Sequence, residues 1–286
     1  MTPRIGGYAI DKEDRAFLRS IVREMPLACR SFSVPDMVDP WKIDPDLNPT
    51  EDQLQIGACQ GNSPSDCVEF CAHIETGSVV QISRMFCYLG SQKMDGISGD
   101  NGSTLSGGTK LLKDVGACLE SVFPYPQSYP RNGWKAIPQA AWDEAKKFKM
   151  NGAIDIKEVG EIRQFIGSGG GLIQIGIPWY SGLEPQNGFI TQFAPGSNYG
   201  GHAVCFAGYV PDEVVKRKSS AGYWLILKNS WGKRWGINGR AYVSVEAAAA
   251  MLKHKFTVMV GRSDLETPRP RPVPVDWTKP DKGMIA

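Results

Sequence analysis

The sequence predicts an α+β protein in which a mainly helical front half and a strand-rich back half form two lobes that meet at a cleft. Apolar residues at helical spacing dominate up to about residue 150, and short β-rich runs separated by Gly, Pro and Asn follow them. Helices gathered before strands, without alternation, favour a segregated α+β architecture. The 286 residues are enough for one large domain or for two small ones that share a core.

Residues 1–34 are expected to form an N-terminal extension with one amphipathic helix, because their apolar residues recur at helical spacing. These apolar residues are Phe17, Leu18, Ile21, Val22 and Met25. The next segment, 35–49, is rich in Pro and Asp and is expected to be extended chain.

A mainly helical lobe is predicted over residues 35–150. Apolar positions at helical spacing run through 64–89 and predict its central helix. The Gly-, Ser- and Asp-rich segment 95–108 is expected to be a loop, and 109–119 a further helix.

The start of the central helix depends on Pro64. A proline inside a helix removes a backbone hydrogen bond and collides with the preceding turn. Ser63 and Pro64 have the residue types of an N-cap and a first helical position. We therefore expect the helix to start late, after Cys59, or to be kinked.

A β-rich lobe is predicted over residues 151–262, followed by a Pro-rich C-terminal tail over 263–286. The tail contains PRPRPVPVDWTKP and is expected to be extended or polyproline-like and outside the core. The β-rich runs of the lobe are 171–177, 202–210, 223–227, 241–245 and 256–260.

Composition and charge exclude several classes of function. A formal net charge of +2 is too balanced for a nucleic-acid binder. No apolar stretch approaches the roughly 18 residues of a membrane helix, and the N-terminus lacks the features of a signal peptide. We therefore expect a protein without nucleic-acid or membrane partners that is cytoplasmic or associated with an assembly.

Seven cysteines, an odd number, leave at least one thiol free. Cys67, Cys71 and His73 lie close in sequence but lack a fourth zinc ligand at a recognisable spacing. The sequence thus predicts no metal and no organic cofactor.

Three segments carry residues of the types that nucleophilic catalysis requires. They are DQLQIGACQGNS (52–63), NYGGHAVCFAGY (198–209) and YWLILKNSWGKRWGINGRAY (223–242). A thiol becomes a strong nucleophile as a thiolate, which an adjacent imidazolium or a helix N-terminus favours. Cys59 is therefore the expected nucleophile and His202 the residue that takes and returns its proton. Asn229 would orient the imidazole, and Gln53 would donate its amide to the oxyanion.

These segments are similar to those of the papain-like (C1) cysteine peptidases, in the bacterial and viral style that lacks the secreted-type disulfide. The resemblance rests on the order Gln–Cys–His–Asn, the step of six residues from Gln53 to Cys59, and the GGHAV and KNSWGxxWGxxG patterns. It covers residues 34–260. It implies a papain-like two-lobe fold, with the active-site cleft between a helical lobe and a β-barrel-like lobe. It also implies hydrolysis of peptide or isopeptide bonds through an acyl-thioester on Cys59.

The resemblance also implies roles for residues around the triad. Trp231 stands where the family has a tryptophan that shields the hydrogen bond between the histidine and the asparagine. Gly102 and Ser103, with Asn101, stand where the family has a glycine-bearing strip that lines the substrate cleft. Gly102, Ser103 and Trp231 are therefore the expected substrate-binding residues.

The sequence departs from the family pattern next to the nucleophile. Gln60 follows Cys59 where a tryptophan is common, and Ile56 replaces the cysteine of the secreted-type disulfide, which fits a reducing compartment. Cys67, in QGNSPSDCVEF, is a rival nucleophile. Its segment matches the family motif only with one extra residue between Gln60 and Cys67, whereas the segment of Cys59 needs none, so Cys59 is favoured. Residues 1–34 are much shorter than a full inhibitory prosegment, so the enzyme is expected to be made active or to be held inactive by something else.

Two other functions are compatible with the same residues. The acyl-enzyme chemistry also serves deamidation or acyl transfer to an amine. A structural or assembly component that keeps the fold with little activity is the other possibility. In that case a partner chain or larger assembly would hold the N- and C-terminal extensions.

Overall fold

A computed structural model describes residues 6–9, 16, 18, 20, 22–24, 33–194 and 196–265 of the chain. The helices are α3 (Pro40–Ile43), α4 (Cys59–Thr76), α5 (Arg84–Asp95), α6 (Leu105–Lys110), α7 (Gln139–Ala145), α8 (Val159–Gly167), α9 (Asp212–Val215) and α10 (Val245–Lys253). Shorter helical turns are η1 (Leu111–Val115), η2 (Gly133–Ala136), η3 (Lys146–Phe148) and η4 (Ser181–Leu183). The strands are β1 (Arg23–Glu24), β2 (Met150–Asp155), β3 (Leu172–Tyr180), β4 (Phe189–Ile190), β5 (Asn198–Pro211), β6 (Tyr223–Lys228), β7 (Arg240–Val243) and β8 (Val258–Leu265).

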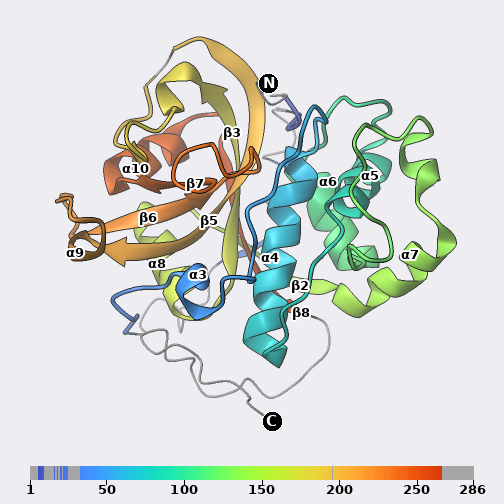
Figure 1. The fold of residues 1–286 in the computed structure, drawn as a ribbon, viewed down its shortest axis with the longest axis horizontal. Coiled ribbons are helices and arrows are strands. Elements are labelled where there is room, and N and C mark those ends of the chain that lie inside the picture. Colours follow the sequence, from blue (N-terminus) through green and yellow to red (C-terminus); the bar gives the residue numbers. More distant parts are fainter. Residues whose placement is uncertain are drawn as a thin grey trace.

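The predicted α+β architecture with two lobes is confirmed. Helix α4 runs between the β-sheet on one side and α5, α6 and α7 on the other (Figure 1). The strands form one sheet in the order β1-β2-β8-β3-β5-β6-β7-β4. β3, which pairs with both β5 and β8, is buried along nearly all of its length, because elements of the fold cover both of its faces.

Helix α4 begins at Cys59, and Pro64 lies inside it. The expected late start at Ser63 and Pro64 is therefore wrong. The helix is buried from Cys59 to His73, so packing along this length outweighs the one backbone hydrogen bond that the proline gives up. The helix ends at Gly77, whose φ of 71° is the left-handed conformation that glycine adopts without strain.

The segment predicted as a loop over 95–108 ends earlier than expected. Helix α6 begins at Leu105, because the Thr104 hydroxyl accepts a hydrogen bond from the Gly107 N–H at 3.0 Å. The helix expected over 109–119 instead continues α6 into the π-helical turn η1 and ends at Val115. The segment 35–49 is not wholly extended, because it contains α3.

The ends of the chain differ in part from the expected extensions. Leu18 is helical and buried, but Arg23 and Glu24 form β1, which pairs with β2, so the helix does not reach Met25 as expected. Strand β8 extends to Leu265, beyond the start of the predicted tail. Phe17, Ile21, Met25 and the tail from residue 266 lie outside the described residues. Among the described helices, none combines the length and the apolar character needed to cross a membrane.

Candidate active site

Cys59 is the first residue of α4 and is fully buried. A helix N-terminus carries unpaired N–H groups and a partial positive charge, which favour a thiolate. The effect of burial outweighs that of the helix N-terminus and raises the pKa of the Cys59 thiol to about 12. Hydrogen bonds from backbone N–H groups, foremost that of Ala203, lower this pKa but do not compensate for burial. The thiol is therefore neutral in this conformation.

His202 lies on β5 and pairs with Ile177 of β3. Its Nε2 is 2.7 Å from Oδ1 of Asn229, which directly follows β6. An amide oxygen only accepts hydrogen bonds, so Nε2 donates; the Ser230 N–H, 2.8 Å from the same oxygen, fixes the orientation of the amide. Burial lowers the pKa of His202 to about 4, against the effect of Asn229, and the imidazole is neutral.

The imidazole is enclosed by tryptophans. Trp231 stacks on His202 with ring centroids 4.5 Å apart and an interplanar angle of 27°. Trp179, at the end of β3, meets the same ring edge-on at 5.1 Å. Trp231 thus covers one face of the His202 ring. Trp179 was not identified from the sequence, because it lies two residues beyond the predicted β-run 171–177, whereas β3 extends to Tyr180.

Gln53 lies beside the Asn229 segment. Its backbone N–H donates to the Ser230 carbonyl at 2.8 Å, and its Oε1 accepts from the Ser230 hydroxyl at 2.7 Å. Its Nε2 donates to the carbonyl of Ile56 at 3.0 Å. The structure therefore brings the loop of Gln53 and the chain after Asn229 together, just ahead of α4.

The strip that contains Gly102 and Ser103 is held by α5. The Gly102 N–H donates to the Tyr88 hydroxyl at 3.0 Å, and the Gln92 amide donates to the Gly102 carbonyl at 2.9 Å. Tyr88 also donates to Asp100 at 2.8 Å, and Asp100 accepts from the Gly57 N–H at 2.9 Å. These residues were not identified from the sequence, because they act only through contacts that the fold creates.

The N-terminal segment 6–9 lies across this strip. The Ser103 N–H donates to the Gly7 carbonyl at 3.1 Å, and the Ala9 N–H donates to the Ser103 carbonyl at 2.9 Å. Tyr8 and Ser103 form a parallel bridge. On the other side, the Gly6 and Tyr8 N–H groups reach the Gly201 carbonyl at 3.1 and 3.3 Å. The strip expected to bind substrate thus pairs with the chain's own N-terminal segment.

Gly7 sits directly over the nucleophile. A Cβ built on Gly7 would be 2.9 Å from Cys59 Sγ and 2.2 Å from the Gly57 carbonyl oxygen. A Cβ on Gly102, whose φ is +75°, would be 2.7 Å from the Gly7 oxygen. Cys59 and His202 have no exposed surface in this conformation.

The rival nucleophile Cys67 lies near the middle of α4 and is buried. Its Sγ donates to the Ser63 carbonyl at 3.4 Å and is 3.7 Å from Cys205 Sγ. It is eight residues along the helix from Cys59, about 12 Å at 1.5 Å per residue. Cys67 packs in the core cluster of the sheet, whereas Cys59 packs with Ala203, the neighbour of His202.

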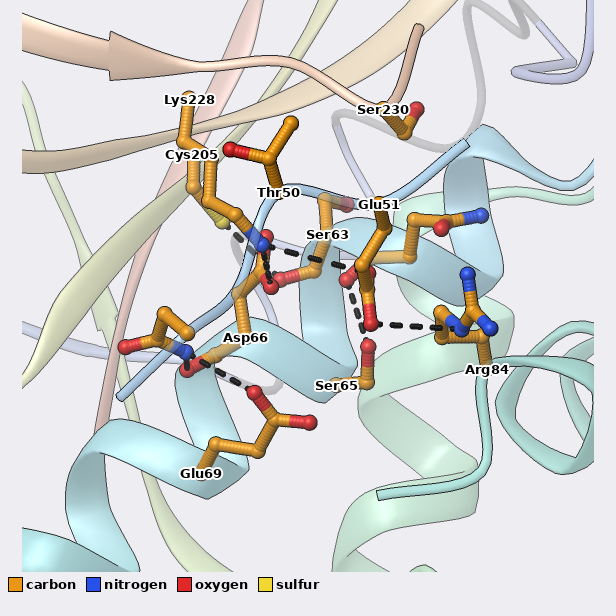
Figure 2. Close-up of polar contacts among 12 residues, drawn as sticks. Thr50, Glu51, Ser63, Ser65, Asp66, Glu69, Arg84, Cys205, Lys228 and Ser230 are labelled. Carbon is orange, nitrogen blue, oxygen red and sulfur yellow. Dashed lines mark hydrogen bonds and ion pairs between the residues drawn. The ribbon is translucent and has the colours of Figure 1, made fainter. Parts of the chain in front are cut away.

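A buried charge network lies behind the site and joins its segments. Lys228, directly before Asn229, reaches from β6 to Asp66 on α4 and lies 3.9 Å from Glu51, two residues before Gln53 (Figure 2). Glu51 also pairs with Arg84 of α5 at 3.2 Å. One ammonium thus bridges the three segments that carry Cys59, Gln53 and Asn229.

The protonation of this network follows from its burial. Desolvation raises the pKa of Glu51 to about 7, against the Lys228 charge. It also raises the pKa of Asp66 and of Glu69, which accepts hydrogen bonds from the Asn48 amide and the Ile82 N–H. The carboxylates, mainly Asp66, raise the pKa of Lys228 above its usual value, despite desolvation. No group of His, Cys, Asp and Glu side chains suited to a metal ion occurs among the described residues.

A two-lobe α+β fold with a cysteine at the start of α4, and with a histidine on β5 hydrogen-bonded to an asparagine after β6, defines a papain-like cysteine peptidase. The chain belongs to this family: the family model described as "Papain family cysteine protease" matches residues 34–259.

The chain is similar in sequence to cysteine proteases of plants and animals. The chain is 26% identical over 249 residues to the germination-specific cysteine protease 1 of Arabidopsis thaliana, with 82% of this chain and 58% of the relative covered. It is 26% identical over 217 residues to procathepsin L of Rattus norvegicus, with 73% and 60% covered. The chain thus spans 58 to 60% of the length of these two relatives.

Solved structures share the fold. Xylellain, a cysteine protease from Xylella fastidiosa, superposes with a TM-score of 0.68 at 20% identity and covers 92% of this chain and 98% of its own. The ragweed cysteine protease Amb a 11 in its proform gives a TM-score of 0.65 at 17% identity, with 92% and 78% covered. A cysteine protease of Carica candamarcensis in complex with E-64 gives 0.59 at 18% identity, with 82% and 100% covered.

Proposed function

We propose that the protein hydrolyses peptide or isopeptide bonds through an acyl-thioester on Cys59. The observation that supports this most strongly is the 2.7 Å contact between His202 Nε2 and Asn229 Oδ1. Nδ1, the other ring nitrogen, has no hydrogen-bond partner among the described residues, which leaves it available to the thiol. Cys59 therefore serves as the nucleophile and His202 as the base, and Asn229 already holds the ring of His202 in its orientation.

The chemical steps follow from these positions. Sγ of Cys59 gives its proton to His202 and attacks the carbonyl carbon, which forms the C–S bond. The Gln53 amide and the Cys59 N–H stabilise the oxyanion. His202 returns the proton to the leaving amine as the C–N bond breaks, and then activates the water that hydrolyses the thioester. Asn229 holds the ring in one tautomer throughout.

The conformation described here is latent in this proposal. Segment 6–9 covers Cys59, so a substrate reaches the thiol only after the segment has moved. Burial also keeps the Cys59 thiol and the His202 ring neutral, whereas the reaction needs a thiolate and an imidazolium. Two contacts of the segment support latency: it pairs with Ser103 of the strip, and Gly7 lies against Cys59.

Labelling with E-64 and peptide mapping test this proposal. The full chain is compared with its Gly7→Ala variant, and each is compared with a second form that also carries His202→Ala. We expect an adduct on Cys59 in the Gly7→Ala variant that disappears with His202→Ala. An adduct on Cys67 would mean that the nucleophile is misassigned. A folded, reduced protein that gives no adduct in any form would instead favour a structural component that retains the fold.

Deamidation and acyl transfer use the same acyl-enzyme. Mass spectrometry of a treated peptide separates the reactions, because hydrolysis cleaves the chain, deamidation adds about 1 Da to an intact chain, and transfer yields an adduct. We expect cleavage.

A further inference from the structure

One carboxylate holds two of the three tryptophans that gather around His202. The indole N–H of Trp179 donates to Oε1 of Glu184 at 3.3 Å, and the indole N–H of Trp235 donates to Oε2 at 3.1 Å. Glu184 directly follows η4, in the connection between β3 and β4, and is half-buried. An indole N–H is a donor only, and when buried it needs an acceptor. Each oxygen of the carboxylate therefore serves one indole.

The third tryptophan, Trp231, depends on the other two. Its Nε1 is buried and has no hydrogen-bond partner among the described residues. The ring packs edge-on against Trp179, with centroids 5.2 Å apart, and against Trp235 at 6.0 Å. Trp231 is also the ring that stacks on His202 at 4.5 Å. Its orientation over the imidazole is therefore fixed by packing on the two indoles that Glu184 holds.

This arrangement needs a carboxylate and not merely a side chain of the same shape. Glutamine has a single acceptor oxygen, and its NH2 group would face the N–H of the second indole. Two donors would then point at each other, and a buried donor without an acceptor is strongly avoided. With glutamine at position 184, one of the two indoles would have to turn away.

We propose that Glu184 is a positioning residue of the peptidase reaction, which holds the tryptophan wall (Trp179, Trp231 and Trp235) against His202. This inference rests on the proposed function and adds to it a residue that lies outside the three catalytic segments. Glu184 contacts neither the thiol nor the imidazole and acts through the wall. The wall excludes water from the base and keeps its ring in place for proton transfer, a step that tolerates little misplacement.

Titration of His202 tests whether Glu184 holds the wall. Burial lowers the pKa of His202 to about 4, and an opened wall should raise it toward the ordinary value of about 6.5. The Cys59 thiol, with a pKa of about 12, stays neutral in this range. The ring nitrogens of the three histidines are followed by NMR between pH 8 and pH 5 in the full-length wild type, Glu184→Gln and Glu213→Gln, and His202→Gln assigns the signal.

The control, Glu213, is exposed on α9. We expect the His202 ring to stay neutral down to pH 5 in the wild type and in Glu213→Gln, and to become protonated above pH 5 in Glu184→Gln. The same titration in all three proteins would overturn the proposal.

Peptide hydrolysis in the Gly7→Ala background, whose cleft we expect to be open, tests the effect on the reaction. Glu184→Gln should lower kcat about tenfold or more, with a much smaller change in KM. The same substitution is then made together with Trp235→Phe. One indole donor remains in that variant and the single oxygen of glutamine satisfies it, so Glu184→Gln should cost much less. Equal losses with and without Trp235 would show that Glu184 does not act through the indoles and would overturn the proposal.

Urea unfolding reports whether each variant folds. If Glu184→Gln alone does not fold, the double variant still decides: its kcat should match that of Trp235→Phe, and a tenfold deficit would contradict the inference. If E-64 never labels Cys59 in the Gly7→Ala parent, the proposed function fails and the His202 titration still tests the wall. If the parent is labelled and cleaves peptides but Glu184→Gln changes neither kcat nor the titration, only this inference fails.

Discussion

Gly7 lies against Cys59: a Cβ on Gly7 would be 2.9 Å from the cysteine sulfur. The contact places the N-terminal segment over the cleft, with Tyr8 buried in one cluster with Cys59. It removes the thiol from water, whereas Trp231 and Trp179 enclose the His202 ring, and burial keeps both groups neutral. The position of residues 6–9 and the protonation of the Cys59 thiol are therefore linked.

Acid should destabilise the protein through His202. Burial lowers the pKa of His202 to about 4, below the roughly 6.5 of an exposed histidine. Its folded pKa is lowered, so its contribution to the free energy of unfolding is complete above pH 6.5 and is lost as the pH falls toward 4. The loss is at most about 3 kcal/mol. Urea unfolding at pH 7.5 and pH 4.5 should show a smaller difference for His202→Gln than for the wild type; an unchanged difference would contradict the buried neutral ring.

Trp231→Ala, made in the Gly7→Ala background, should both destabilise the protein and slow the reaction of Cys59. It removes an indole that is 7% exposed and stacks on His202, and such truncations cost about 3–5 kcal/mol. Water would also reach the His202–Asn229 hydrogen bond. Trp231→Phe keeps a ring in place and should recover part of both losses. Recovery of stability without any recovery of the E-64 labelling rate would argue against the shielding role.

Lys228→Met should cost about 3–5 kcal/mol of unfolding free energy at pH 7, because Asp66 and Glu51 lose their buried cation. Without the cation the folded pKa of these carboxyls lies further above the unfolded value. Their contribution to stability is then complete below the unfolded pKa of about 4 and is lost as the pH rises. The defect should therefore shrink between pH 7 and pH 4.

The matched control is Lys146→Met. Lys146 is 69% exposed and pairs with Asp143, and an exposed pair of this kind is worth about 1 kcal/mol or less. Unfolding by urea measures both variants. Equal losses in the two would show that the buried network does not stabilise the joined segments.

Gln53→Glu should reduce kcat in the Gly7→Ala background by about 10²–10³. The substitution keeps an oxygen that accepts from the Ser230 hydroxyl, but removes the amide donor. Binding of the peptide should change much less than kcat. Peptide hydrolysis under steady-state conditions measures both, and a change confined to KM would remove Gln53 from the oxyanion site.

The sequence was sufficient for the fold class, through the order of its helical and β-rich runs, and the resemblance of its GGHAV and KNSWGxxWGxxG motifs to those of papain-like peptidases predicted the pairing of His202 with Asn229. The sequence was misleading at Pro64. Local propensity predicts that a helix starts there, but α4 begins at Cys59, because its burial against the rest of the protein outweighs that propensity. The cap at Thr104 was visible as a residue type and was overlooked among the glycines around it.

Other features could not be predicted from local patterns. Lys228 is of a type that is normally exposed, and only the fold places Asp66 and Glu51 beside it. The Gly6-Gly7 pair has no periodicity, and its position over Cys59 depends on backbone contacts with residues about 95 and 195 positions away. Such long-range contacts carry no signal in the neighbouring sequence.

The central claim is that residues 6–9 cover a competent nucleophile, and the rate of E-64 labelling at Cys59 tests it most directly. Full-length wild type, Gly7→Ala and the control Gly160→Ala are labelled at pH 7 and mapped. We expect Gly7→Ala to be labelled at least about tenfold faster than the wild type, because a Cβ that collides with the Gly57 carbonyl displaces the segment. Gly160→Ala, at an exposed position of α8 with no atom within 4 Å of the new Cβ, should match the wild type. Equal, rapid labelling of all three proteins at Cys59 would contradict the claim that the segment closes the cleft.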